Sequence, residues 1–277
     1  MNFDKLIFSV GYNMTGNYET TRDVVQDINL KLLESPITDK IIDRRSYVIR
    51  MTINRCLNLK KKEQRIQYIG TWLPEPIKED RERTIQQNNF EQSNLLCYEL
   101  AFLMEQLSQT ERAVFVLREA FDYDHKEIAE AINISSDNSR QLLRRAKAKV
   151  ANLKHRSVSN SNSLEIAKQF VNHIQQGNIA DLLELFNEDI SVIGDGGGKA
   201  PAIAKPIFGK KEVAQFFFKL FGSKTFRPTF SFTEILSQPA ITLHSNGDKM
   251  CAMVLSIHEN RISRVFGVLN PDKLLAL

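Results

Sequence analysis

The chain has 277 residues, a length that suits two or three domains rather than one. Its composition, with 42% hydrophobic and 25% charged residues, is typical of a soluble globular protein, and no apolar run is long enough to span a membrane. The three cysteines are odd in number and far apart, which argues against a metal site and indicates a reducing cytoplasm. A net charge of +4 is too small to establish a nucleic-acid partner by itself.

The first part of the chain predicts two amphipathic helices in succession. A segment over residues 3–17 ends on Gly16-Asn17, a helix C-cap signal. The next segment, over residues 19–33, carries an apolar face opposite an exposed polar face. That polar face contains Asp23, Gln26 and Asp27.

A third helix is predicted over residues 44–65, and it carries one polar stripe. Arg50, Asn54, Asn58 and Lys61 follow one another at spacings of four, four and three, with Tyr47 alongside. Such a stripe is more often plain surface. Here it combines an aromatic ring, amides that can bond to base edges and a basic tail, a mixture that suits single-stranded DNA.

Residues 77–176 contain neither glycine nor proline, as expected for helices joined by polar turns. Within them we predict helices over residues 110–121 and 125–132, a tight turn through 133–135 and a longer helix from Ser136. This arrangement is that of a helix-turn-helix.

The last helix of this block carries a basic face. From Asn138 to Leu164 there are seven Lys or Arg residues and no acid, whereas solvated helix faces usually interleave both signs. We therefore favour DNA binding over plain surface. The residues nearest the helix N-terminus, expected to read base edges, are Asn138, Arg140 and Gln141. Those expected to hold phosphates are Arg144, Arg145 and Lys147.

A polar Ser/Asn tract over residues 154–163 precedes a block of mixed character. Helices are predicted over 164–176, 180–186 and 210–221, and the later alternating segments predict four strands. The stretch "DGGGK", residues 195–199, is not a P-loop, because the first glycine and the final hydroxyl of that motif are missing. It follows a predicted strand, and we expect it to form a loop that packs on or near the linker around Trp72.

Taken in order, these segments resemble an extracytoplasmic-function (ECF) sigma factor of bacterial RNA polymerase. Residues 23–32 resemble the segment that docks on core polymerase, 47–65 the segment that melts and reads the minus-ten element, and 107–150 the domain that reads the minus-thirty-five element. The resemblance thus implies polymerase binding by Asp23, Gln26 and Asp27. Asn58 stands where the family usually has aspartate, and Asn138-Ser139 stand where many members have Thr-Val.

Three short motifs, "WLPEP" (72–76), "DGGGK" (195–199) and "NPDKL" (270–274), together resemble the ECF subgroup that carries a C-terminal SnoaL-like domain of NTF2-like fold. The resemblance implies region 2 over 1–67, a linker over 68–92, region 4 over 93–155, a linker over 156–163 and a SnoaL-like domain over 164–277. It also implies that this last domain regulates the sigma factor in cis, with a possible small hydrophobic ligand. The candidate interdomain residues are Trp72, Pro74, Glu75, Pro76, Asp195, Gly196, Gly197, Gly198, Lys199, Asn270, Pro271 and Asp272.

Two other classes of protein compete with a sigma factor. A helix-turn-helix regulator with a ligand-binding domain would have no use for the first helical block. A fused SnoaL-like cyclase or isomerase would need converging acid and base groups, whereas Asp195, His244 and His258 are scattered along the chain. We therefore expect a cytoplasmic, non-enzymatic protein without metal or cofactor, whose partners are core RNA polymerase and promoter DNA, and not a membrane.

Overall fold

The computed structural model describes residues 3–34, 43–63, 68–77, 95–150, 162–222, 226–245, 247–275 and 277, except for the side chains of 60–63. These residues divide into two compact units. Unit 1 comprises residues 3–34, 43–63, 95–96 and 100–150, and unit 2 comprises the rest, including the linker residues 68–77. Among the described residues, no helix is long and apolar enough to cross a membrane.

Unit 1 begins with three helices: α1 (Asp4–Thr15), α2 (Tyr18–Glu34) and α3 (Arg44–Glu63). The predicted stop after α1 is confirmed, since Gly16 lies in the left-handed region with φ of 64°. The Asn17 side chain then accepts a hydrogen bond from the backbone N–H of Thr20 at 2.7 Å, which stabilises the first turn of α2.

The helix-turn-helix follows in α5 (Tyr98–Leu103), the short 3-10 helix η2 (Met104–Gln106), α6 (Gln109–Glu119), α7 (His125–Ile132) and α8 (Ser136–Val150). Capping boxes start both α6, through Ser108 and Glu111, and α7, through Asp124 and Glu127. Asn133 makes the predicted turn before α8 by adopting a positive φ of 55°.

The two helical blocks of unit 1 share one hydrophobic core. α1 contacts both α2 and α3, and it also contacts α6, while α3 contacts α6 and α7. Leu6, Val24, Ile53, Val114 and Ala146 are all buried in the same apolar cluster. The sequence indicated two separate blocks, so their common core is a property of the tertiary structure.

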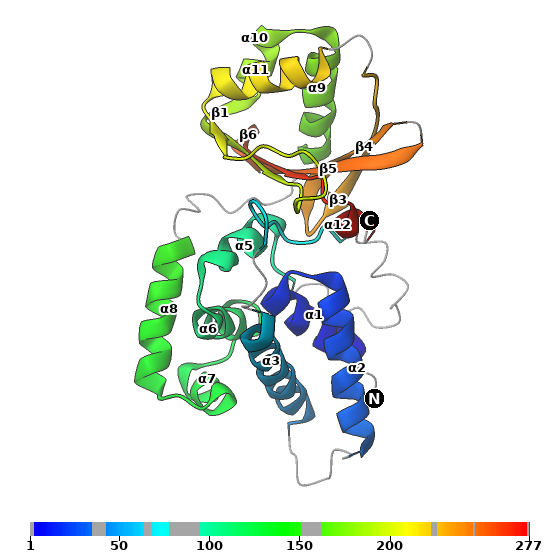
Figure 1. Ribbon diagram of the computed structural model, residues 1–277. Helices are drawn as coiled ribbons and strands as arrows, with labels where there is room; N and C mark the ends of the chain where they lie inside the picture. Colours follow the sequence, from blue (N-terminus) through cyan, green and yellow to red (C-terminus); the bar gives the residue numbers. More distant parts are fainter. Residues whose placement is uncertain are drawn as a thin grey trace. The chain divides into compact units, whose positions relative to one another are not determined.

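Unit 2 contains a six-stranded sheet with the order β2-β1-β6-β5-β4-β3 (Figure 1). The strands are β1 (Phe186–Asp195), β2 (Ile207–Phe208), β3 (Thr229–Ile235), β4 (Gln238–Ser245), β5 (Asp248–His258) and β6 (Arg261–Val268). β1 and β6 run parallel, and the other pairs are antiparallel. The C-terminal ends of β1 and β6 therefore lie side by side, and the chain continues from β6 into the short helix α12 (Pro271–Leu274).

Helices α9 (Ser163–Gln176), α10 (Ile179–Glu184) and α11 (Lys210–Phe221) gather on one face of the curved sheet (Figure 1). Phe170 and Phe217 pack edge to face between them, with ring centroids 5.0 Å apart. The expected fold class, two all-α domains followed by an α+β cone, is confirmed. Two details were wrong: Phe186 opens β1 instead of closing a helix, and β2 was not predicted.

Candidate functional site

The polar face of α2 is only partly free. Asp23 and Gln26 are exposed, as the sequence indicated. Asp27 is half-buried, because its Oδ2 accepts from the Nε of Arg55 at 2.7 Å and lies 2.5 Å from Nη2 of the same guanidinium. The expectation of a fully exposed Asp27 was therefore wrong, since this carboxylate ties α2 to α3.

The predicted stripe on α3 lies on one side of that helix. Arg50, Asn54 and Asn58 are exposed and Tyr47 is half-buried, while the opposite face of the helix is buried. The Asn54 amide donates to the backbone carbonyl of Ala131 in α7 at 3.3 Å, so this side chain contacts the helix-turn-helix within unit 1. The side chain of Lys61 lies outside the described residues.

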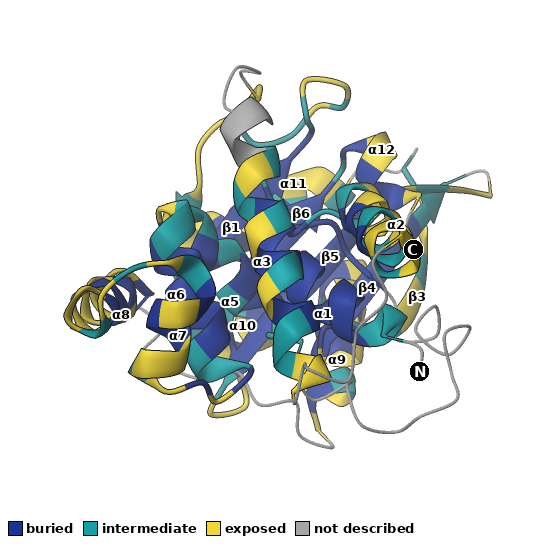
Figure 2. Cartoon of the chain, turned by 90° about the horizontal axis from the view of Figure 1, so that it is seen from below, coloured by how far each residue is buried: buried dark blue, intermediate teal, exposed yellow. Residues whose placement is uncertain are grey.

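The basic residues of α8 are exposed, whereas Leu142, Leu143 and Ala146 are buried. Figure 2 shows that the exposed and buried residues of α8 lie on opposite sides of the helix. All six residues predicted to meet DNA are exposed: Asn138, Arg140, Gln141, Arg144, Arg145 and Lys147. The helix thus presents these polar side chains to solvent.

Ion pairs distinguish the basic residues of α8 from one another. Arg140 lies 2.6 Å from Asp137 in an exposed pair, and Lys147 lies 2.7 Å from Glu119 of α6. Within the described ranges, Arg144 and Arg145 make no ion pair, so these two cations are the most available for phosphates.

His125 links α7 to α8. Its Nδ1 lies 2.9 Å from the Oγ of Ser139, a buried hydroxyl on the inner side of α8. Burial lowers the pKa of His125, and the nearby charges of Arg140 and Arg118 lower it further. The neutral imidazole is therefore the form that the folded helix-turn-helix prefers.

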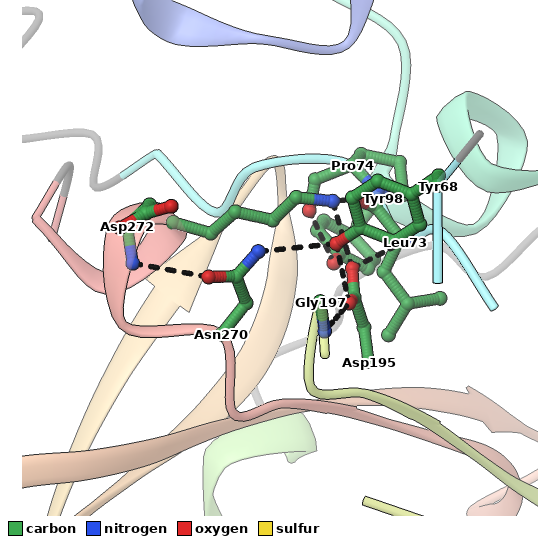
Figure 3. Close-up of polar contacts among 9 residues, drawn as sticks. Tyr68, Leu73, Pro74, Tyr98, Asp195, Gly197, Asn270 and Asp272 are labelled. Carbon is green, nitrogen blue, oxygen red and sulfur yellow. Dashed lines mark hydrogen bonds and ion pairs between the residues drawn. The ribbon is translucent and has the colours of Figure 1, made fainter. Parts of the chain in front are cut away.

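In unit 2, the linker is held by a set of residues that we call the linker site: Tyr68, Leu73, Asp195, Gly197, Asn270 and Lys273. Asp195 lies at its centre, with its side chain fully buried. One carboxylate oxygen accepts from the Tyr68 hydroxyl at 2.6 Å and the Gly197 N–H at 2.9 Å, and the other accepts from the Leu73 N–H at 2.9 Å and the Lys273 ammonium at 2.7 Å. Figure 3 shows Asp195 pointing toward Tyr68 and Leu73.

The ammonium of Lys273 joins charge and aromatic contacts at the linker site. It lies 4.1 Å from the ring centroid of Trp72 and 4.9 Å from that of Tyr68, both cation–π contacts. It also donates to the Leu73 carbonyl. The buried charge of Asp195 is thus paired and fully hydrogen-bonded, which is the condition under which burying it is tolerable.

The phenol of Tyr68 donates to Asp195 and accepts from Asn270. Burial raises the pKa of Tyr68, and the hydrogen bond to the Asp195 carboxylate raises it further. The Asn270 amide donates to the same phenol oxygen at 3.1 Å, while its own oxygen accepts from the Asp272 N–H. At the surface, Lys199 pairs with Asp272 at 2.5 Å.

The glycines of the loop are required by close approach. Gly197 and Gly198 have positive φ values of 57° and 72°. A Cβ on Gly197 would lie 2.2 Å from Nδ2 of Asn270, and one on Gly198 would lie 3.0 Å from the side chain of Ile69. Only glycine lets this loop meet both Asn270 and the linker.

A second set of contacts attaches the start of α5 to the same sheet. The Tyr98 hydroxyl donates to the Pro74 carbonyl at 2.7 Å, and its ring packs on Phe266 of β6 at a centroid distance of 5.5 Å. The Glu99 N–H donates to Gln238 at 2.7 Å, and Arg264 pairs with the Glu99 carboxylate at 2.7 Å. Unit 2 therefore holds both the linker residues 68–77 and the first residues of α5.

Of the predicted interdomain residues, Glu75 and Pro76 are buried, and Pro271 is exposed at the start of α12. Gly196 accepts at its carbonyl from the N–H groups of Lys199 and Ala200, which closes the loop. The sequence did not single out Tyr68, Tyr98 or Lys273. Lys273 lies within "NPDKL" and could have been noticed there, but no local pattern marks either tyrosine.

Two of the other chemical candidates of unit 2, His244 and Asp195, have separate partners. His244 lies 3.2 Å from Ser231 on neighbouring strands, and Asp195 is committed to the linker. Among the described residues, no group of three or more His, Cys, Asp or Glu could hold a metal ion. The cone does enclose a cavity of about 480 Å³ between α11 and the sheet.

Comparison with known proteins agrees with this arrangement. Sigma-70 region 2 matches residues 2–66, and Sigma-70, region 4 matches residues 98–150. The chain is 28% identical over 217 residues to the ECF RNA polymerase sigma factor SigJ of Mycobacterium tuberculosis. The aligned region covers 76% of this chain and 68% of SigJ. The chain therefore carries both conserved sigma-70 regions and is similar to ECF sigma factors. It is also 24% identical over 284 residues to the probable ECF sigma factor SigI of the same species, covering 97% and 91% of the two chains.

The fold of the whole chain has a solved counterpart. The crystal structure of Mycobacterium tuberculosis SigJ has a TM-score of 0.74 and 22% identity, over 98% of this chain and 95% of that one. The region 2 match accounts for the first helical block, which a conventional helix-turn-helix regulator does not need. Sigma factors act by binding core RNA polymerase and promoter DNA, so this protein is an initiation factor and not an enzyme.

Proposed function

We propose that this sigma factor directs promoter-specific initiation and that its C-terminal domain regulates it in cis through the linker site. The observation that supports this is Asp195, whose buried carboxylate accepts from Tyr68, Leu73 and Lys273. The contact fixes the stretch of chain through which region 2 continues toward region 4. A domain that holds or releases this stretch alters the spacing available to the two DNA-binding regions.

The surfaces of unit 1 divide the remaining tasks. We assign core polymerase binding to the exposed Asp23 and Gln26, with Asp27 positioning α2 through Arg55. We assign the minus-ten element to the stripe of Tyr47, Arg50, Asn54, Asn58 and Lys61. We assign the minus-thirty-five element to the exposed side of α8, with Asn138, Arg140 and Gln141 reading bases and Arg144, Arg145 and Lys147 holding phosphates.

These tasks correspond to the domain limits expected from the sequence: region 2 over 1–67, region 4 over 93–155 and the regulatory domain over 164–277. The protein would act in the cytoplasm, where its polymerase partner works. The apolar cavity of the cone supports one further partner, a small hydrophobic ligand.

The test is run-off transcription with core polymerase and the full chain. Asp195→Asn keeps the size of the side chain but removes the charge that faces Lys273, so the linker site should weaken. Emission from Trp72, the single tryptophan, reports whether that has happened. We expect a red shift together with an altered transcript yield, while the exposed control Asp189→Asn changes neither.

An unchanged transcript yield from an Asp195→Asn protein whose Trp72 emission has shifted would refute regulation through the linker site. If the wild-type chain did not bind core polymerase, the assignment as an initiation factor would be refuted. The two failures are distinguishable, because core polymerase binding is measured by co-purification without DNA.

A further inference from the structure

The cavity of the C-terminal cone lies next to the linker site. We infer that this cavity binds a neutral, non-ionised hydrophobic molecule and that its occupancy is transmitted to the linker site by the loop that follows β1. The transmission step rests on the regulatory function proposed above; the binding step does not.

The chemistry of the cavity wall selects the ligand class. Its volume of about 480 Å³ falls in the range of small-molecule sites. Every described residue that lines it is apolar or is glycine, proline or cysteine, with α11 contributing four side chains: Phe216, Phe217, Leu220 and Phe221. A carboxylate or ammonium group would lose its hydration there without gaining a partner, which disfavours charged ligands strongly.

The mouth of the cavity is also apolar. Leu220 and Met250 both line it and are 44% and 47% exposed. The thiol of Cys251 faces the same space, and burial raises its pKa to about 12. This group therefore stays uncharged at neutral pH and offers no thiolate to a cationic ligand.

One continuous segment connects the cavity with the linker site. Pro201, Ala202 and Ile203 line the cavity, while Gly197, four residues before Pro201, touches Asn270 of the linker site. The segment packs tightly against β1, because a Cβ on Gly194 would lie only 2.7 Å from the side chain of Ile203. A ligand that displaces Ile203 therefore moves the chain that carries Gly197.

A second connection runs through the two residues that follow β6. Leu269 lines the cavity, and its backbone N–H donates to the carbonyl of Asp195 at 2.7 Å. The neighbouring Asn270 N–H donates to the same oxygen at 3.0 Å. Two segments that line the cavity therefore contact Asp195, the residue that holds the linker. Because the protein interior is close-packed, a displacement of either segment is passed on to Asp195.

The binding experiment uses the full chain and the neutral fluorescent probe phenylnaphthylamine. Cys251→Phe should fill the cavity and reduce probe affinity by about tenfold or more, since a ring replaces space that the probe needs. Cys251→Ala, at the same position, should retain the affinity. Leu243 in β4 is the cross-strand partner of Cys251 in β5. Leu243→Phe therefore fills the same cavity and serves as the test if Cys251→Phe does not fold.

Ligand charge is tested by competition with two molecules of equal chain length. Decanol should displace the probe, whereas decanoate should need at least about tenfold higher concentration, because its carboxylate finds no partner in the wall. Equal competition by the two molecules would overturn the neutral ligand class. Equal probe affinity in the wild-type and both filled variants would overturn the site itself.

Transmission is read from Trp72 with decanol, which does not absorb in its emission range. Decanol should shift Trp72 emission in the wild-type chain and in Cys251→Ala, but not in Cys251→Phe. Asp195→Asn should bind the probe normally yet lose the shift. Probe binding without any Trp72 response in the wild-type chain would overturn transmission, whereas unchanged transcription in Asp195→Asn would refute only the regulatory role proposed above.

Discussion

Arg55 holds Asp27 from the neighbouring helix, with Nε 2.7 Å and Nη2 2.5 Å from the same carboxylate oxygen. The side chains are 28% and 37% exposed, so solvent screens the pair and its net contribution is about 1 kcal/mol or less. Two acids on one helix face therefore have different roles. Asp23 is exposed, whereas Asp27 joins α2 to α3.

Asp23→Lys and Asp27→Ala separate polymerase binding from stability. We expect Asp23→Lys to abolish co-purification with core polymerase while the free energy of unfolding changes by no more than about 0.5 kcal/mol, as for most surface substitutions. Asp27→Ala should lower that free energy by about 0.5–1 kcal/mol. Denaturant melts and co-purification check both variants, and normal co-purification of Asp23→Lys would contradict the assignment of this face.

The recognition helix should show two kinds of DNA contact. Arg144→Ala should weaken binding evenly on specific and random DNA and lower the slope of log affinity against log salt by about 0.9, as loss of one phosphate contact does. Arg140→Ala should cost about 1–3 kcal/mol on the specific site only, if it bonds to a base edge. Affinity titrations at several salt concentrations measure both effects.

Lys147→Ala is the matched control for Arg144→Ala. Lys147 already pairs with Glu119 at 2.7 Å, so we expect it to contribute less to the salt slope than Arg144. If Arg140→Ala and Arg144→Ala act identically on specific and random DNA, the division of roles along α8 is incorrect.

Gly197→Ala should break the linker site through a steric clash. Any L-residue at positive φ costs roughly 1–2 kcal/mol, and here the new methyl would also lie 2.2 Å from Asn270. Gly177→Ala bears the same backbone strain, with φ of 71°, but its methyl meets nothing within 4 Å. We expect a red shift of Trp72 emission only in Gly197→Ala, and equal spectra in the two variants would show that the loop does not support the linker.

The buried pair of Asp195 and Lys273 should give a non-additive cycle. Lys273→Met leaves the Asp195 charge buried without its partner, which should cost about 3–5 kcal/mol. Adding Asp195→Asn removes that charge, so the double variant should be less destabilised than the sum of the two single variants. Denaturant melts of the four proteins measure the coupling energy, and additive effects would mean that the ion pair contributes little.

The helix-turn-helix should lose stability in mild acid because of His125. Its pKa is lowered from an ordinary value of 6.5, so the unfolded chain binds the proton more readily than the folded one. The free energy of unfolding is therefore unaffected by His125 above pH 6.5, and it declines as the pH falls below that value. The charges of Arg140, Arg118 and Lys147 lower this pKa and that of Asp124 raises it, while Ser139 contacts the ring.

His125→Gln can still bond to Ser139 but does not titrate. Between about pH 7.5 and 5.5, the wild-type melting temperature should fall more steeply than that of His125→Gln. An NMR titration of the His125 ring gives the folded pKa directly. A measured pKa above 6.5 would contradict the prediction.

Much of the fold and of the proposed DNA-binding surfaces could be predicted from local pattern. Gly16 stops α1, Asn133 turns α7 into α8, and the apolar spacing of α2 and α8 marks their buried faces. These features depend on residues three or four positions apart, so the sequence alone carries them. The glycine loop was also identified as a point of close approach, since only glycine tolerates the backbone that such a loop needs.

Only the tertiary structure decided which partners these residues meet. Asp195 is separated from Tyr68 by 127 positions and from Lys273 by 78, and no periodicity relates positions so far apart. Asp27 looked free in the sequence because Arg55 comes 28 residues later on another helix. Local spacing determines which face of an element is apolar. A charge can be buried only where groups distant in the sequence pair with it and hydrogen-bond to it, and the packing of the whole chain decides which groups do so.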